Sequence, residues 1–332
     1  MLSNAIRPAS IFALSLAAIS PLFAGAALAK SSKDNLKIGI IAFAYNSPAV
    51  TAMTDAAIAD CKARNWTCEL FDGKTDPVAT SNAGVNFVNR KFDAILNSVS
   101  DNNQLTTVIK AAKAANIPFV SMFSGDVPGI SADIGASGVV QGALLAGVLR
   151  DKIDLKGKVA IVNWNVLPVL RERTRGFKAT VADDKDIQVV EIEVKVPGYV
   201  DDAYNQVTSL LQSNKDVKAI VTGWDELAPG VVRAIEQAGM KDQITVYSYD
   251  ALPSTLELIR KGGPMTLTVG FGNKVVGQKA MSVIADAIDG KPVPFRSIMV
   301  RSCIFTKANL PAPGVEPDYS KCTTFTGEIE NQ

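Results

Sequence analysis

Residues 92–122 read FDAILNSVSDNNQLTTVIKAAKAANIPFVSM and contain one complete repeat of the expected architecture. Two short apolar runs, at 93–99 and 117–123, enclose a segment at 104–116 whose apolar residues have helical spacing. Continuous apolar strands are typical of sheets that are covered on both faces, and a helical connection makes the two strands parallel. The stretch therefore predicts a strand–helix–strand unit of a parallel α/β sheet.

The same alternation extends along the chain in both directions. Before this unit, strands are expected at 36–43 and 67–72, and helices at 48–64 and 79–91. After ISADIG at 130–135 a second series begins, with strands expected at 158–164, 187–196, 217–223, 244–250 and 266–270, and helices at 138–153, 171–184, 203–214, 226–239, 254–262 and 275–290. Two such series, each of about a hundred residues or more, predict two doubly wound α/β domains.

The first 29 residues have the pattern of a secretory signal. A basic start, MLSNAIR, precedes the apolar run IFALSLAAISPLFAGAA, and the segment ends in Ala-Leu-Ala at 27–29. Pro21, Gly25 and the shortness of the run argue against a membrane anchor, for which about 18 consecutive apolar residues are typical. We expect export and cleavage after Ala29.

Composition excludes several classes of function. The chain has 332 residues with 34 basic and 33 acidic side chains, and the two become equal when Arg7 leaves with the signal. This balance, without a basic cluster, gives no indication of nucleic acid or an anionic membrane as partner. Histidine is absent, which excludes catalytic triads that use histidine and metal sites with histidine ligands. No Gly-rich phosphate loop is present, so no cofactor is expected.

Four cysteines in an exported chain predict two disulfides. Three pairings are possible, and closeness in sequence favours Cys61–Cys68 and Cys303–Cys322. The second bridge would hold the Pro-rich segment at 307–321.

Ligands of doubly wound sheets bind beyond the carboxyl ends of the strands. The residues that follow the expected strands are aromatic and polar, and they lie at 43–47, 97–98, 123–124, 164–165, 224–225, 250 and 271. In TGWDELAPGVVR at 222–233, helix capping would explain Asp225 but not Trp224. This composition suits a small polar ligand with C–H faces.

Several stretches together resemble the periplasmic sugar-binding proteins of ABC importers, of the ribose- and galactose-binding type. They are FDAILNSVSDNN at 92–103, AAKAANIPFVSM at 111–122, RERTRGFKA at 171–179, TGWDELAPGVVRAIEQAG at 222–239 and VYSYDALPSTLELI at 246–259. The ligand-binding part of lac-repressor-like regulators has the same fold, but this chain has a secretory signal where those proteins have a helix-turn-helix.

The resemblance implies a periplasmic binding protein of type I, with two doubly wound lobes joined by three crossings near 133–135, 270–271 and 299–301. The N-terminal lobe would be 34–133 plus 271–299, and the C-terminal lobe 134–270 plus 300–327. Such a protein is a periplasmic monomer that closes on a sugar or polyol and delivers it to a permease in the inner membrane.

The family's binding residues are matched at several positions. Arg173 in RERTRGF matches an arginine that holds sugar oxygens, and Asp250 in YDALP an aspartate that accepts hydrogen bonds from hydroxyls. Asn97 matches an asparagine after the third strand, and Tyr199 lies at or next to an aromatic contact. Asp225 retains the second member of a polar pair.

The chain also departs from the family. Phe123 and Phe271 replace polar residues, Trp224 replaces the first member of the polar pair, and Ala49-Val50 replaces two aromatic walls. We therefore expect a ligand with fewer hydroxyls than an aldohexose, such as a deoxy sugar or short polyol. The predicted binding residues are Phe43, Tyr45, Ser47, Asn97, Phe123, Arg173, Tyr199, Trp224, Asp225, Asp250 and Phe271.

Three alternatives remain open at the level of sequence. Asp225, Glu226 and Asp250 could supply the carboxylate pair of a glycosidase. The same fold could load a membrane sensor instead of an importer. Trp224, Phe123 and Phe271 could form an aromatic box for a cationic ligand.

Overall fold

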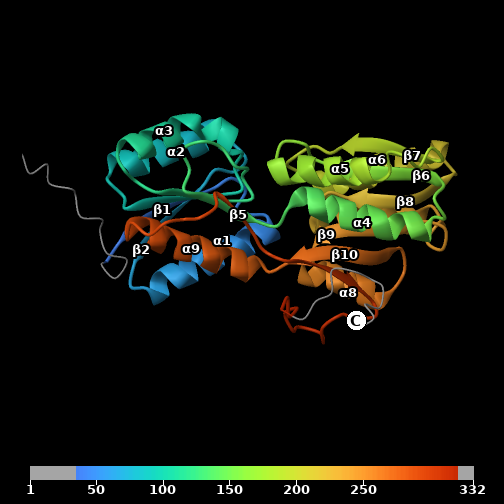
Figure 1. The fold of residues 1–332 in the computed structure, drawn as a ribbon. Helices are drawn as coiled ribbons and strands as arrows, with labels where there is room; N and C mark the ends of the chain where they lie inside the picture. Colours follow the sequence, from blue (N-terminus) through green and yellow to red (C-terminus); the bar gives the residue numbers. More distant parts are fainter. Residues whose placement is uncertain (1–34, 321–332) are drawn as a thin grey trace, which may run out of the picture.

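The structure, a computed structural model, describes residues 35–320 and contains two sheets, each with helices on both faces (Figure 1). The first sheet has the strand order β11-β5-β4-β3-β1-β2, and the second has the order β12-β10-β9-β8-β6-β7. We call the first sheet with its helices the first lobe, and the second sheet with its helices the second lobe. The predicted signal segment and Cys322 lie outside the described residues.

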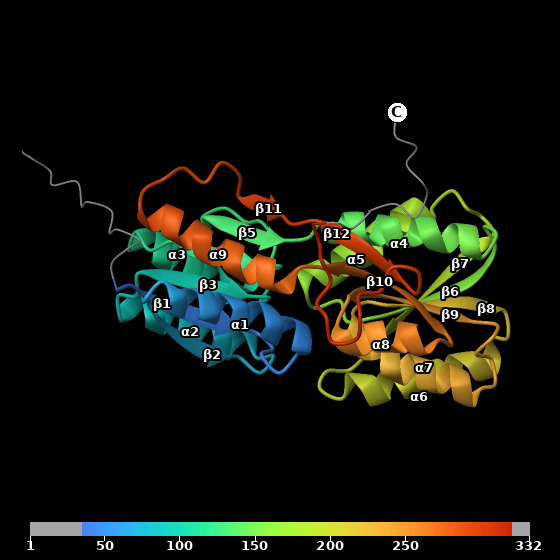
Figure 2. The same ribbon diagram turned by 90° about the horizontal axis from the view of Figure 1, so that it is seen from below.

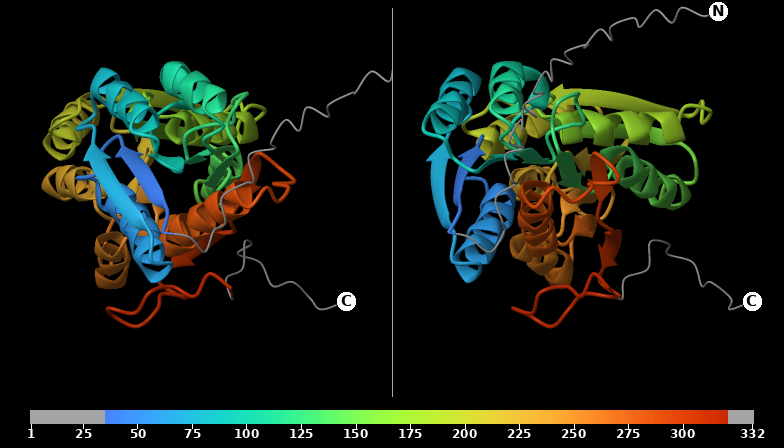
Figure 3. Two further views of the ribbon diagram at one scale, coloured as in Figure 1. Left: turned by 90° about the vertical axis from the view of Figure 1, so that its left-hand side faces the viewer. Right: turned by 60° about the vertical axis from the view of Figure 1, so that its left-hand side comes forward.

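The first lobe is built on six parallel strands. They are β1 (Lys37–Ala42), β2 (Thr67–Asp72), β3 (Ala94–Ser98), β4 (Phe119–Met122), β5 (Ala132–Gly135) and β11 (Ser297–Met299). Its helices are α1 (Pro48–Ala63), α2 (Pro77–Asn89), α3 (Thr106–Ala114) and α9 (Asn273–Ile288), with the 3₁₀ turn η1 (Asn102–Leu105). Seen from the end of this lobe, α9 in orange lies beside α1 in blue, although the two are distant in sequence (Figure 3).

The second lobe repeats this arrangement with one antiparallel strand. Its strands are β6 (Gly157–Asn163), β7 (Ile187–Glu193), β8 (Val217–Thr222), β9 (Thr245–Asp250), β10 (Met265–Phe271) and the antiparallel β12 (Ser302–Thr306). Its helices are α4 (Gly138–Lys152), α5 (Pro168–Thr180), α6 (Tyr199–Ser213), α7 (Ala228–Gln237) and α8 (Pro253–Lys261), with η2 (Asp225–Leu227). In Figure 2, α6, α7 and α8 cover one face of the sheet, and α4 and α5 lie toward the other.

Local sequence explains how the helices begin close to the strand ends. Four helices have proline as their first residue, at Pro48, Pro77, Pro168 and Pro253. Proline suits this position because its fixed φ is helical and its missing N–H would have no partner there. The prediction of two doubly wound α/β units is confirmed.

The chain passes between the two sheets three times. The passages lie after β5, after β10 and between β11 and β12 (Figure 2). The predicted lobe boundaries at 133/134 and 270/271 each fall within a strand. β5 continues in the first sheet to Gly135, and Phe271 is the last residue of β10 in the second sheet, where it pairs with Ser302. Strands β5, β11 and β12 had no counterpart among the expected strands.

A disulfide joins Cys61 in α1 to Cys68 in β2, as predicted. Cys303 is also disulfide-bonded, but its predicted partner lies outside the described residues, so that pairing stays a prediction. No helix within residues 35–320 combines the length and the apolar character that a membrane span requires.

Candidate functional site

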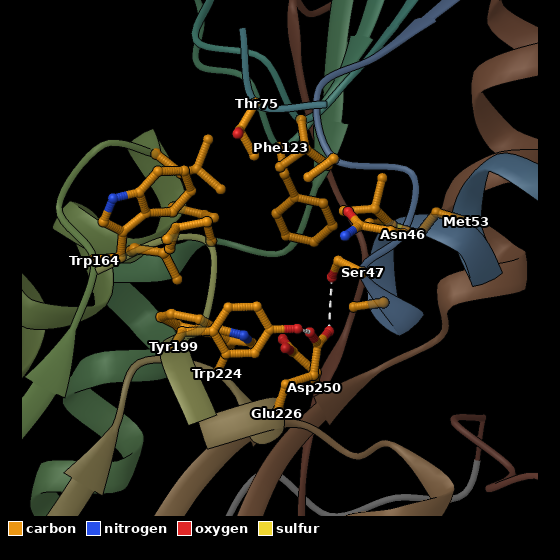
Figure 4. A pocket seen from close by; sticks show the side chains of 18 of the residues that line it. Asn46, Ser47, Met53, Thr75, Phe123, Trp164, Tyr199, Trp224, Glu226 and Asp250 are labelled. Carbon is orange, nitrogen blue, oxygen red and sulfur yellow. Dashed lines mark hydrogen bonds between the residues drawn. The ribbon is translucent and has the colours of Figure 1, made fainter. Parts of the chain in front are cut away.

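A cavity of about 420 Å³ lies between the two lobes, where strand ends of both sheets face each other (Figure 4). Its volume is within the range of roughly 300–1,000 Å³ that is typical of small-molecule sites. The lining residues are Ala44, Asn46, Ser47, Ala49, Val50, Met53, Asp72, Lys74, Thr75, Val99, Phe123, Trp164, Leu167, Val169, Leu170, Arg173, Val196, Pro197, Tyr199, Trp224, Glu226, Asp250 and Phe271.

Arg173 and Asp250 form a buried ion pair on the second-lobe side of the cavity. The Arg173 Nη2 donates to Asp250 Oδ1 at 2.7 Å, and the two side chains are only 3% and 5% exposed. Arg173 also donates from Nε to Gln141 Oε1 at 2.9 Å and from Nη1 to the Gly223 carbonyl at 2.8 Å. A guanidinium has five N–H groups, so donors remain for a ligand.

Gly223 is required at its position by close packing. A Cβ there would lie 1.9 Å from Asn163 Oδ1. The absent side chain leaves room for Asn163 next to Gly223, the first residue after β8, whose carbonyl accepts from Arg173 Nη1.

A second carboxyl lies directly behind this ion pair. Asp225 is buried and accepts from the Leu252 N–H at 2.7 Å and from Thr268 Oγ1 at 2.9 Å. Burial raises the pKa of both Asp225 and Asp250. The Arg173 guanidinium opposes this shift at Asp250, whereas the charge of Asp250 raises the pKa of Asp225 further.

Glu226 links the two lobes inside the cavity. Its Oε1 accepts from Ser47 Oγ of the first lobe at 2.6 Å, and its Oε2 accepts from the Tyr199 hydroxyl at 2.5 Å (Figure 4). Burial and the nearby Glu226 raise the pKa of Tyr199, so its hydroxyl stays protonated and donates. Each carboxylate oxygen retains a lone pair for a further donor.

Two contacts at the rim also join the lobes. Arg171 Nη2 donates to Asp101 Oδ2 at 2.7 Å, which connects α5 to the loop after β3. The Phe43 ring stacks on Trp164 with centroids 6.3 Å apart and an interplanar angle of 15°. Together with the Ser47–Glu226 bond, these contacts join the two lobes across the cavity.

Aromatic rings form much of the cavity wall. Tyr199 packs on Trp224 with centroids 5.4 Å apart, and Phe123 packs on Phe271 at 4.6 Å. In Figure 4, Phe123 and Trp164 border the open space on the sides away from Glu226 and Asp250.

Backbone strain is concentrated at this cavity. Lys74, Thr75, Val99, Phe123 and Asp250 all line it, and all have positive φ, between 49° and 110°. Non-glycine residues rarely adopt this conformation, at a cost of about 1–3 kcal/mol each, and such residues cluster at functional sites. Five of the eleven non-glycine residues with positive φ in the described part of the chain line this cavity, which favours it as the candidate site.

The structure brings together most, but not all, of the predicted binding residues. Those that line the cavity are Ser47, Phe123, Arg173, Tyr199, Trp224, Asp250 and Phe271. Asn97 is buried behind the wall, where its Nδ2 donates to the Ser100 carbonyl and to Asn102 Oδ1. Phe43 stacks at the rim, the Tyr45 hydroxyl bonds to Asp55, and Asp225 lies behind the ion pair.

Glu226, Trp164, Asn46 and Val99 also line the cavity, although they were not among the predicted residues. Trp164 and Asn46 lie in the strand-end segments 164–165 and 43–47 that the sequence singled out, but they were not carried into the predicted binding set. Among the described residues, no group of three or more Cys, Asp or Glu side chains has an arrangement that could hold a metal ion.

Comparison with known proteins finds the family that the sequence motifs resemble, over most of the chain. The profile of the family described as "Periplasmic binding protein domain" matches residues 38–292. The ribose import binding protein of Bacillus subtilis is 25% identical over 87% of this chain and 94% of its own length.

Solved structures also share the fold. An ABC sugar transporter subunit from Rhodobacter sphaeroides matches with a TM-score of 0.79 at 22% identity, over 83% of this chain and 99% of its own. A solute-binding protein from Bacillus halodurans with bound myo-inositol matches with a TM-score of 0.77 at 22% identity, over 84% and 96% of the two chains.

Proposed function

Because this chain belongs to the periplasmic binding protein family, we propose that it captures a sugar, polyol or sugar-like molecule between its lobes and delivers it to an ABC importer. One observation carries the proposal. The strained, aromatic-walled cavity is closed by contacts from both lobes and has an Arg173–Asp250 pair and Glu226 facing into it. A ligand there would contact both lobes at once.

The polar groups of the cavity suit hydroxyls. Arg173 has free donors, and Asp250 and Glu226 have free acceptor positions, whereas a hydroxyl both donates and accepts. The relatives point to the same class, since their names specify ribose import and their bound ligands include myo-inositol.

The site supports binding without turnover, as in the family. A glycosidase needs two carboxyl groups that flank a scissile bond. Asp225 is held behind the ion pair by Leu252 and Thr268, and Asp250 is bound to Arg173.

The remaining parts of the proposal concern place and partners. We place the protein in the periplasm as a monomer, after cleavage of the signal behind Ala29, and its partner as an inner-membrane permease. The three passages between the sheets would be the hinge about which the lobes close.

Tryptophan fluorescence tests the proposal because two of the three tryptophans, Trp164 and Trp224, line the cavity. D-Ribose, D-allose and myo-inositol are titrated against the protein. At least one should change the emission and raise the melting temperature, since a ligand at a hundred times its Kd adds about 2.7 kcal/mol of stability.

Matched variants locate the change in emission. It should persist in Trp66→Phe, because Trp66 is buried in the first lobe away from the cavity. It should be lost in the double variant Trp164→Phe, Trp224→Phe. No change in emission or melting temperature with these compounds, nor with sugars that carry an alkyl, thioalkyl or aryl group, at millimolar concentration would contradict the proposal.

A further inference from the structure

The polar groups of the cavity occupy only part of its surface. Ser47, Glu226 and Asp250 gather at one corner, where the hydrogen bonds from Ser47 and Tyr199 meet at Glu226 (Figure 4). Away from this corner most of the lining is apolar, and Phe123 and Trp164 face the open space. The polar residues Asn46, Asp72, Lys74 and Thr75 also line the cavity, and Figure 4 shows Thr75 and Asn46 on the side of Phe123. A ring covered with hydroxyls would leave some of them against side chains that cannot bond them, which costs free energy.

Two neighbouring residues of the apolar wall are held in a costly backbone conformation. Val99 follows β3 and Phe123 follows β4, and the Val99 N–H bonds to the Met122 carbonyl, so the two lie at adjacent strand ends. Their φ values are 71° and 54°. For a β-branched valine this is a genuine outlier, because its Cβ clashes with the backbone at positive φ. Glycine and asparagine adopt the conformation far more easily.

The strained backbone at Val99 and Phe123 places apolar side chains on the cavity wall. Asparagine at position 99 would relieve it and would add a hydrogen-bonding group to the cavity, as a site for an ordinary sugar could use. The chain instead has an apolar side chain at both strand ends and a tryptophan, Trp164, on the facing lobe.

We infer that the ligand is a sugar or polyol carrying an apolar substituent, an alkyl, thioalkyl or aryl group, which packs against Val99, Phe123 and Trp164. Its hydroxyls bond at the corner formed by Ser47, Glu226 and Asp250. This inference rests on the proposed function and narrows it to an amphipathic substrate class. Each buried methylene of the substituent would strengthen binding about fourfold.

Two matched pairs of probes test the inference by calorimetric titration. The first pair is D-ribose and 5-deoxy-5-methylthio-D-ribose, and the second is methyl and phenyl β-D-glucopyranoside, so the apolar group lies at opposite ends of the sugar. In at least one pair, the member with the larger apolar group should bind roughly tenfold more tightly or better.

The variant Val99→Asn separates this role from folding. Because asparagine tolerates positive φ, the melting temperature should stay the same or rise. The affinity for the substituted probe should fall at least fivefold, while that for the unsubstituted probe does not fall. Leu155→Asn is the matched control, since Leu155 also has positive φ, 56°, but lies outside the cavity. It should leave both affinities unchanged.

The other outcomes are distinguishable. If the member with the smaller apolar group binds as tightly as its partner in both pairs, the inference is overturned and the proposed function stays intact. Equal loss of affinity for both members of a pair in Val99→Asn would also overturn it. Failure of all four probes, together with D-allose and myo-inositol, would overturn the proposed function and this inference with it.

Discussion

Arg173 and Asp250 are charged groups with almost no access to water, at 3% and 5% exposure of their side chains. Such a pair contributes little net stability, because desolvation offsets the attraction, but removing one partner leaves an uncompensated buried charge. Arg173 therefore has two roles. It holds Asp250 ionised on the wall of the cavity, and it keeps donors free for a ligand.

We expect Arg173→Ala to lower the free energy of unfolding by about 3–5 kcal/mol, measured by urea denaturation without ligand. Arg171→Ala is the matched control two residues away in the same helix. Its pair with Asp101 is 44% exposed on the arginine side and 8% on the aspartate side, so the cost of its loss should be smaller than that of the buried pair, about 1 kcal/mol. Equal losses of unfolding free energy in the two variants would show that breaking the buried pair costs no more than breaking the Arg171–Asp101 pair.

The strand-end rule located the cavity from sequence but not every side chain that faces it. Asn97 lies within β3, where its buried amide donates to the Ser100 carbonyl and to Asn102 Oδ1. Val99, just beyond the strand, lines the cavity instead. Likewise η2 directs Asp225 inward and its neighbour Glu226 into the cavity. Whether a side chain points into the cavity or into the lobe depends on a shift of one residue along the strand and on the conformation of the turn. The apolar periodicity of the sequence specifies neither.

At the scale of elements, the expected helices and the long strands were predictable because each carries a periodic or continuous apolar pattern. β11 and β12 were not. β11 has three residues, two of them exposed, and β12 is an edge strand that runs antiparallel to β10. Both are ordered by tertiary pairing, since their partners β5 and β10 present open edges.

The Cys61–Cys68 disulfide is a link between two such elements, the last turns of α1 and the start of β2. Its cysteines are 7 residues apart, so it closes a short loop. The double variant Cys61→Ala, Cys68→Ala should lose about 2.5 kcal/mol of unfolding free energy, the chain-entropy value for a loop of about eight residues. Urea denaturation in non-reducing buffer measures the loss.

Thiol titration accompanies this measurement. Wild type and double variant should both show no free thiol after denaturation, because the variant keeps the Cys303 bridge. An unchanged unfolding midpoint in the double variant would mean that the bridge contributes no stability and that α1 and β2 are fixed by packing alone.

At the scale of the whole molecule, few side-chain contacts join the two lobes, one of them inside the cavity and two at its rim. The lobes meet through the Ser47–Glu226 bond, the stack of Phe43 on Trp164 and the Arg171–Asp101 pair. A ligand that contacts both lobes adds to these contacts only in the closed state, so it shifts the population toward closure. The measured affinity then depends on how often the free protein is closed.

Arg171→Ala tests this dependence because Arg171 does not line the cavity, so its loss removes no ligand contact. Loss of this partly exposed ion pair, worth about 0.4–1 kcal/mol, should weaken affinity roughly two- to fivefold for any probe that binds, through a smaller closed fraction. Small-angle scattering should show a larger radius of gyration for the free variant than for free wild type, and equal radii at saturating ligand. Arg175→Ala, exposed one turn further along α5, should match wild type in both measurements. An affinity loss that is the same for Arg175→Ala and Arg171→Ala would assign the effect to the charge of α5 and not to the bond between the lobes.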